Sequence, residues 1–371
     1  MHSPSSRLHP PPRRHEPERF RGIEADFGPE HADTFRRKAQ AAESEEGIRQ
    51  RAFKKAARSA FLWPEGASAL FAAGRSLTKL KGIGPFLERQ LRSWIEQPPA
   101  AISPPPLRRD FLALADARAL LGAQPKWAQA LRGDLQMHTH WSDGSGSVEK
   151  MATAAAERGY EYIAITDHSK GLKIAGGIDK AALSRQAEEI SATNAALRAA
   201  GGNLTVLRSI EMNLNPRGEG DMNPLALRSL DLALGSFHSS LRKTEDQTER
   251  YLSAIRNPHV HIHGHPRGRI YNFRLGLTAD WSRVFAEAAR LDKAIEIDSY
   301  PDRQDLNPAL LKIARREGVR ISLGTDAHHP WQFEFIELGL AAALKARIPA
   351  DRIINFLSAT ELKNWAKQDR S

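Results

Sequence analysis

The segment GDLQMHTHWSDGSGSVEKMATAAAERGYEYIAITDHS, residues 133–169, carries the clearest fold signal in this chain. Its apolar run over 134–138 is followed by a turn, by an amphipathic window over 148–158 and by a second apolar run over 162–168. This order predicts a strand, a helix and a second strand. A helix between two strands is the connection that parallel strands need, so we expect this segment to begin a parallel α/β fold.

The same alternation continues towards the C-terminus. Further strand candidates are 204–211, 231–238, 259–265, 294–299 and 320–328. Amphipathic windows lie between them, which makes seven strand–helix repeats in all. Such a pattern predicts a parallel sheet, and most economically a closed seven-stranded β/α barrel of the TIM type. A doubly wound open sheet is the alternative, but no GxGxxG motif follows the first strand.

The residues before the barrel divide into two parts. Residues 1–45 are rich in Pro, Arg, Glu and His without hydrophobic periodicity, so we expect a disordered basic tail there. Residues 46–131 have helical spacing, interrupted by five prolines in QPPAAISPPP over 97–106. We therefore expect a small all-α region over 46–131 and a barrel domain over 132–371.

Charge and composition restrict the compartment and the partners. The net charge is +10, of which +9 falls on residues 1–132. This asymmetry suggests a polyanion-binding appendage, and a basic surface without a partner is the alternative. The chain has no cysteine, which excludes thiol chemistry and disulfides and fits a reducing cytoplasm. We find no long apolar run and no signal-peptide pattern, so we expect a cytoplasmic protein without a membrane partner.

Metal-ligating side chains recur where the predicted strands end. They are His138, Asp143, His168, Glu211, His238, His265, Asp326 and His328. Carboxyl ends of parallel barrel strands meet at one mouth, so these residues are expected to converge. Imidazole and carboxylate without thiolate suit zinc, manganese or iron, and the number of ligands implies two or three divalent ions.

The run HVHIHGH, residues 259–265, contains more histidines than one site can use. The four histidines alternate along the strand and so share one side, but a strand advances about 3.3 Å per residue. We therefore expect only His265, at the end of the strand, to be a ligand. The other three are expected to be packed or exposed.

Residues 133–169 also resemble the opening of a PHP (polymerase and histidinol phosphatase) domain, closest to the version that ends bacterial family X DNA polymerases (PolX). The matching pieces are IEMN around Glu211, GSFH at 235–238, GHPRGR at 264–269, EIDSYPDRQDL at 296–306 and GTDAHH at 324–329. The resemblance spans about 133–345. It implies a distorted seven-stranded β/α barrel with a three-metal phosphoesterase centre.

The resemblance also implies how the ligands are shared. His138, Glu211 and Asp326 would hold one ion, Glu211 would bridge to a second ion held by His238 and His265, and Asp143, His168 and His328 would hold the third. The family usually has DLHxH in the first strand, whereas this chain has Gln136 at the first histidine position. The first site is then weaker or differently filled, or His140 compensates from the loop.

Clustered divalent ions activate water for phosphoester hydrolysis and offset charge on a phosphoryl group. We expect His138, Glu211 and His238 to serve this catalysis. Arg269 and Arg303, in the family-like contexts GHPxGR and PxRxDL, are expected to hold phosphate oxygens. A surface cation is the competing interpretation for both arginines.

The segment SLTKLKGIGPFLERQLRSWIE, residues 76–96, resembles a helix-hairpin-helix motif. Gly82 and Gly84 can expose backbone N–H groups to a phosphate at the start of a helix, and this contact reads no base. The nearby cations Lys79, Lys81 and Arg89 would add electrostatic attraction. A plain helical hairpin with tightly packed glycines is the alternative.

Together these features predict a metal-dependent phosphoesterase that acts on nucleic acid, most specifically a 3′–5′ exonuclease or 3′-phosphatase on DNA. The rival interpretation is a phosphatase for a phosphorylated small molecule such as histidinol phosphate. A third is a non-catalytic nucleic-acid-binding protein, which the change at Gln136 motivates.

Overall fold

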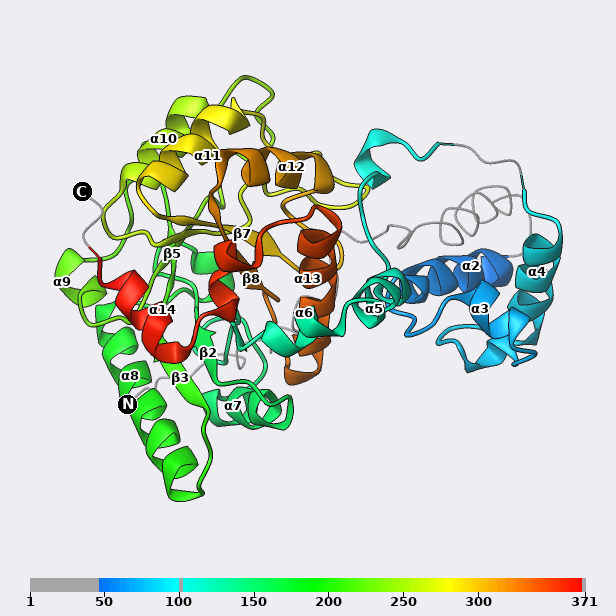
Figure 1. Ribbon diagram of the computed structural model, residues 1–371, viewed down its shortest axis with the longest axis horizontal. Helices are drawn as coiled ribbons and strands as arrows, with labels where there is room; N and C mark the ends of the chain where they lie inside the picture. Colours follow the sequence, from blue (N-terminus) through cyan, green and yellow to red (C-terminus); the bar gives the residue numbers. More distant parts are fainter. Residues whose placement is uncertain (1–46, 100–102, 369–371) are drawn as a thin grey trace, which may run out of the picture.

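The computed structural model describes residues 47–99 and 103–368, so the predicted tail over 1–45 lies outside the described residues. The described chain forms a small helical lobe and a larger α/β lobe (Figure 1). The small lobe contains α2 (Gly47–Ala60), α3 (Ala67–Ala72), the short 3₁₀ turn η2 (Leu77–Lys79) and α4 (Pro85–Glu96).

The small lobe has its own apolar core. In α4 the buried residues Leu87, Leu91 and Trp94 follow helical spacing and form one face. Pro85 begins this helix, where its fixed φ and missing N–H cost nothing. Phe53 of α2 packs against the Trp94 ring at a centroid distance of 6.4 Å, which joins the first and last helices of the lobe.

The second predicted helical stretch, over 107–131, packs on the larger lobe. It contains η3 (Pro106–Arg108), α5 (Leu114–Gly122) and α6 (Pro125–Ala130). Leu114 is fully buried, and Ala117 and Leu121 belong to the same core as the larger lobe. Arg118 reinforces the contact by pairing with Glu337 at 2.7 Å.

The larger lobe has two parallel sheets. The first has the order β1 (Gly133–Asp134), β2 (Tyr162–Ile165), β3 (Thr205–Arg208); the second has the order β4 (Glu211–Asn213), β5 (Leu234–Ser236), β6 (Ile262–His263), β7 (Ala294–Asp298), β8 (Arg320–Gly324). The expected parallel α/β class is confirmed. The single seven-stranded barrel is not: the structure has sheets of three and five strands.

The difference arises within the predicted strand over 204–211. Here β3 pairs with β2, but β4 pairs with β5, so the chain changes neighbours at Ser209 and Ile210. The edges of the two sheets still meet at two isolated parallel bridges, Met137 with Ala327 and His168 with Glu211. Both junctions therefore lie at or next to predicted metal ligands.

Helices cover the outer faces of the sheets (Figure 1). They are α7 (Val148–Glu157), α8 (Lys180–Ala199), α9 (Pro224–Leu227), α10 (Thr248–Arg256), α11 (Trp281–Arg290), α12 (Pro308–Glu317), α13 (Ile336–Lys345) and α14 (Ala359–Ala366). In α11 the buried residues Trp281, Val284, Phe285 and Ala288 form a single stripe, as expected for a helix lying on a sheet. Short 3₁₀ turns complete the loops: η4 (Lys173–Ala175), η5 (Pro330–Phe335), η6 (Ala350–Arg352) and η7 (Ile354–Phe356).

We expected no membrane partner. Over 47–99 and 103–368, every helix is too short or too polar to cross a bilayer.

Candidate metal centre

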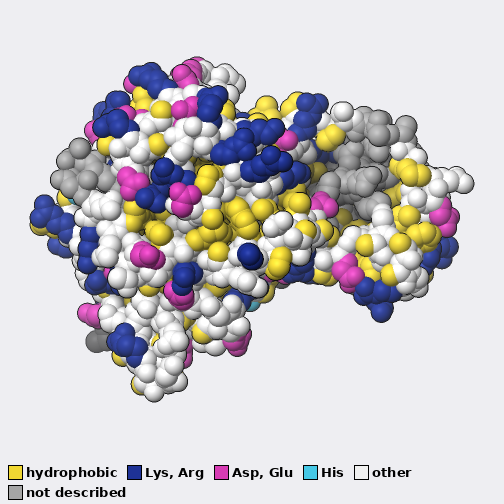
Figure 2. All heavy atoms as spheres, viewed as in Figure 1, with side chains coloured by type: hydrophobic (Ala, Val, Ile, Leu, Met, Phe, Trp, Pro, Cys, Tyr) yellow, Lys and Arg dark blue, Asp and Glu magenta, His cyan; other side chains and the backbone are white. Residues whose placement is uncertain are grey.

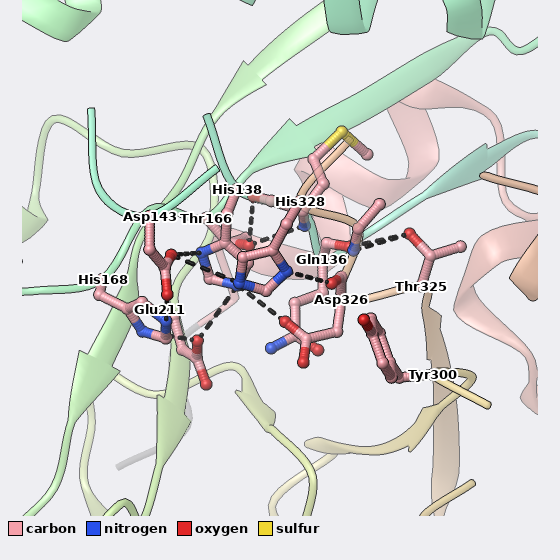
Figure 3. Close-up of polar contacts among 12 residues, drawn as sticks. Gln136, His138, Asp143, Thr166, His168, Glu211, Tyr300, Thr325, Asp326 and His328 are labelled. Atoms are coloured by element: carbon pink, nitrogen blue, oxygen red, sulfur yellow. Dashed lines mark hydrogen bonds and ion pairs between the residues drawn. The ribbon is translucent and has the colours of Figure 1, made fainter. Parts of the chain in front are cut away.

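The predicted ligands converge where the strands end, and Figure 3 shows six of them together. Two groups of donor atoms each lie within 4.8 Å of one another: His138, Asp143, His168 and His328 form one, and His168, Glu211 and His238 form the other. His265 contacts Glu211, and Asp326 contacts His138. All eight residues named from the sequence therefore belong to one cluster.

Glu211 lies in the middle of this cluster and is fully buried. Its Oε1 is 2.7 Å from His265 Nε2 and 3.2 Å from His238 Nε2. Its Oε2 is 3.0 Å from His168 Nδ1 and 3.5 Å from His138 Nε2. A carboxylate whose two oxygens face different imidazoles has the arrangement that a bridging ligand needs.

His138 joins the remaining residues to Glu211. Its Nε2 lies 2.9 Å from Asp326 Oδ1, and the His168 and His328 rings stack on it at centroid distances of 4.3 and 4.5 Å. Asp143 lies 3.6 Å from His168 Nε2 and 3.4 Å from His328 Nε2. The two outer imidazoles of the stack thus share one carboxylate.

Asp167 supports the loop that carries Asp143. Its carboxylate accepts hydrogen bonds from the Thr139 N–H and hydroxyl at 2.7 and 2.6 Å and from the Ser142 hydroxyl at 2.5 Å. Gln186 of α8 donates to it at 2.6 Å. Asp167 is therefore committed to positioning the loop, and its neighbour His168 faces the cluster.

Two of the predicted ligands have an unusual backbone conformation. His265 has φ of 24° and Asp326 has φ of 53°, a region that residues with a side chain rarely adopt. Such strain persists only where surrounding contacts enforce it, and it concentrates at functional sites. Here it turns both side chains inward at the ends of β6 and β8.

Unpaired buried atoms test whether this cluster fits metal ions. His138 Nδ1, His168 Nδ1, Glu211 Oε2 and His238 Nε2 are buried. Although His168 Nδ1 and His238 Nε2 lie 3.0 and 3.2 Å from Glu211 oxygens, none of the four atoms has the geometry of a hydrogen bond among the described residues. An unpaired buried polar atom is costly, whereas a cation satisfies lone pairs that converge on one space. The donor set of histidines and carboxylates therefore fits divalent ions of the zinc, manganese or iron type.

Burial and the neighbouring charges shift the pKa values of these residues in opposite directions. Burial raises the pKa of Glu211, but His168, His238 and His265 outweigh it and hold that pKa well below the usual range. Burial lowers the pKa of His238 to about 4, despite Glu211. His328 behaves oppositely: burial lowers its pKa, but the hydrogen bond to Asp143 raises it to about 9. At neutral pH Glu211 is thus anionic and His238 is neutral, which are the forms that bind a metal, whereas His328 has to release a proton first.

The sequence did not identify the partner of Gln136. With its amide nitrogen towards Glu296, Gln136 donates to the two carboxylate oxygens at 2.9 and 2.6 Å, and both residues are fully buried. Glu296 Oε2 also accepts the His265 N–H at 2.7 Å. Burial and the nearby Asp298 raise the pKa of Glu296 well above the usual range. The available signal was a glutamate inside the apolar strand AIEID of β7.

The compensating role expected for His140 is not supported by its position. Its side chain is 51% exposed and faces Glu189, 3.8 Å away, outside the donor groups. The exposed loop that follows β1 carries it away from the buried cluster. His261 and His263 also lie outside: His261 Nδ1 accepts the Ala233 N–H, and His263 is buried beside Tyr251.

The two predicted phosphate-binding arginines have different surroundings. Arg303 reaches the cluster, forms a hydrogen-bonded ion pair with Asp326 and remains 32% exposed. Arg269 is buried, its guanidinium lies 3.8 Å from the Phe111 ring centroid, and it donates to the carbonyls of Arg109 and Asp110. These contacts commit Arg269 to holding the segment before α5, in place of the expected phosphate contact.

The helix-hairpin-helix candidate lies in the small lobe. Gly82 has φ of 85°, and a Cβ there would meet the Ser59 hydroxyl at 2.8 Å, so the turn requires glycine. Gly84 is exposed at the start of α4, with nothing within 4 Å of a Cβ added there. Lys79, Lys81 and Arg89 are all exposed. The turn therefore offers free space and positive charge at a helix start.

Known proteins share the segment that carries these ligands. The PHP domain profile matches residues 134–326. A DNA polymerase/3′-5′ exonuclease PolX of Bacillus subtilis is 35% identical over 240 residues, which is 64% of this chain and 41% of that protein. A probable phosphatase of Caldanaerobacter subterraneus is 24% identical over 257 residues, which is 66% of this chain and 95% of that protein.

One solved structure is also similar. The histidinol phosphate phosphatase of Lactococcus lactis, complexed with zinc, L-histidinol and phosphate, aligns with 58% of this chain and 93% of its own, at 19% identity and a TM-score of 0.42. The profile match covers just over half of the chain. It begins at the first strand and ends at the ligand Asp326, and on this match the chain belongs to the PHP domain family.

Proposed function

We propose that this chain is a metal-dependent phosphoesterase that acts on DNA ends, as a 3′–5′ exonuclease or a 3′-phosphatase. The observation that carries the hydrolytic part is the buried Glu211 carboxylate, which faces four imidazoles. When bound, two or three divalent ions lower the pKa of a water and offset the charge of a phosphoryl group.

The protein's side chains would hold the ions and orient the phosphate. The eight clustered side chains would hold the ions, and Asp167 fixes the loop of Asp143 through three hydrogen bonds from Thr139 and Ser142. Arg303 lies at the edge of the cluster, where its exposed part can donate to phosphate oxygens. The N–H groups of Gln136 and His265 donate to the Glu296 carboxylate and fix its position.

The small lobe supports a nucleic-acid substrate. Residues 47–99 hold ten Lys and Arg against three Asp and Glu, whereas residues 1–45 hold eight of each, so the tail expected to be basic has no net charge. Positive charge beside the accessible helix start at Gly84 favours the phosphate backbone. Lys and Arg side chains also spread over the larger lobe, with acidic ones among them (Figure 2).

The test uses the full chain, stripped of metal and reloaded with manganese or zinc. Its substrates are 5′-labelled single-stranded oligonucleotides that end in a 3′-hydroxyl or a 3′-phosphate. We expect metal-dependent shortening from the 3′ end or loss of the terminal phosphate. Endonucleolytic fragments, or no reaction with any metal, would contradict the proposal.

A small-molecule phosphatase is the second candidate. It is favoured by the match to 95% of the length of a probable phosphatase, which the PolX match does not approach. Rapid hydrolysis of histidinol phosphate, unaffected by competing oligonucleotide, would select this function over the first.

A further inference from the structure

A tight hairpin over 270–274 follows the ligand His265 along the chain. Ile270 and Arg274 exchange two backbone hydrogen bonds of 2.9 Å each, and Asn272 between them has φ of 54°, which Asn tolerates better than most residues. The turn presents Phe273 to solvent with 46% of its surface exposed. The hairpin backbone therefore holds an aromatic ring at the surface, where a ligand can contact it.

Positive charge surrounds this ring. The guanidinium of Arg242, in the loop after the ligand His238, lies 4.8 Å from the Phe273 centroid, and Arg242 is exposed. Arg274 is the next residue, and its Nε donates to the Gly268 carbonyl. Burial and the charges of Arg303 and Arg242 lower the pKa of Arg274 to about 10, in keeping with three guanidiniums in one region.

The hairpin contacts residues next to the metal centre and residues next to the small lobe. On one side the Tyr271 N–H donates to the carbonyl of Asp302 at 2.7 Å, directly before Arg303 at the metal centre. On the other side the Asn272 N–H donates to the Leu107 carbonyl at 2.9 Å. The Tyr271 ring also packs on Phe61, just beyond α2, at 6.2 Å. The hairpin therefore contacts both the segment that carries Arg303 and the residue that follows α2 of the small lobe.

We propose that Phe273 and Arg242 form a stacking platform for an unpaired base of single-stranded nucleic acid whose end lies in the metal centre. Every base offers a flat face to an aromatic ring, and neighbouring arginines attract the phosphates on either side. The alternative of a protein partner is disfavoured, because the exposed apolar surface here amounts to Phe273 and Leu275 rather than a wide patch. The inference rests on the proposed action on nucleic acid.

The test compares the full metal-loaded chain with Phe273→Ala, Phe273→Tyr and Leu225→Ala. Leu225 is 64% exposed on α9, which lies at the opposite end of the molecule from the small lobe, so it is the matched control (Figure 1). Substrates are a labelled single-stranded oligonucleotide and a chromogenic phosphodiester. We expect Phe273→Ala to lower kcat/KM on the oligonucleotide about tenfold, mainly through KM. The rate of the chromogenic reaction stays unchanged in Phe273→Ala. Phe273→Tyr and Leu225→Ala both keep the parent's kcat/KM on the oligonucleotide.

Equal oligonucleotide kinetics for Phe273→Ala and the parent chain would overturn the platform while leaving the proposed function intact. Failure of the parent chain to degrade any oligonucleotide would instead remove the proposed function. In that case the affinity for a fluorescent single-stranded oligonucleotide decides: a loss in Phe273→Ala but not in Leu225→Ala supports the platform, and equal affinities overturn it.

Discussion

Glu211 Oε1 lies 2.7 Å from His265 Nε2, although the two residues are 54 positions apart and Glu211 begins β4 whereas His265 follows β6. The contact places the carboxylate of β4 against the end of β6, and the other oxygen of the same carboxylate faces His168 from the other sheet. One side chain thus joins ligands from both sheets.

Among substitutions of the eight predicted ligands, Glu211→Ala is therefore expected to reduce the bound metal the most. Loss of an outer partner of a ligand typically weakens metal binding by roughly 10–100-fold, and loss of the central carboxylate should exceed that. Elemental analysis after manganese or zinc loading, with chromogenic phosphoester hydrolysis, measures both effects. His261→Ala is the control, because its ring lies outside the cluster. Equal metal content in Glu211→Ala and the parent would refute the bridging role.

His138→Ala and His140→Ala should differ sharply. His138 is fully buried against Asp326, whereas His140 is half exposed and faces Glu189. We expect His138→Ala to abolish chromogenic phosphoester hydrolysis and His140→Ala to leave it within about twofold, since most surface changes cost little.

His140→Ala also tests whether His140 compensates for Gln136. If His140 is not a ligand, the effects of Gln136→His and His140→Ala on metal affinity should add in the double variant. Strong non-additivity, measured by metal titration, would show that His140 reaches the centre after all.

Gln136 is expected to stabilise the fold through Glu296. Gln136→Leu removes two hydrogen bonds and leaves a buried carboxyl group without those donors, which should lower the free energy of unfolding by about 1–3 kcal/mol. Gln136→His retains an N–H donor, so it should cost less while altering metal affinity. Urea unfolding of both variants without metal measures the difference, and a neutral Gln136→Leu would contradict the pairing.

Arg269 is expected to act in docking rather than catalysis. Arg269→Ala removes the contact with Phe111 and two hydrogen bonds to backbone carbonyls, so the free energy of unfolding should fall by about 2–4 kcal/mol. Limited proteolysis near residues 97–110 should accelerate, while the folded enzyme keeps its rate on a chromogenic phosphoester. Arg217→Ala, at a 78% exposed side chain, is the control. A large loss of rate with unchanged stability would restore the phosphate-binding role.

The sequence revealed the site better than the fold around it. Strand ends are local signals, so the positions of His138, His238 and Asp326 could be predicted from alternating apolar runs. The change of strand partner at Ser209 could not, because pairing depends on sheet closure rather than on the local pattern. The burial of Arg269 depends on Phe111, about 160 positions away, which no window of sequence contains. The Gln136–Glu296 pair was hidden for the same reason.

The two junctions between the sheets have a consequence for how the molecule opens. Each junction has few backbone hydrogen bonds, including Ser169 N–H to Glu211 at one and His138 N–H to Ala327 at the other. His138 and His168 follow strands of the three-stranded sheet, whereas His238, His265 and His328 follow strands of the five-stranded sheet. Ions held among these histidines would link the two sheets at their junctions. Chelation should then accelerate hydrogen exchange at the Ser169 and His138 amides before it affects the inner strand β7.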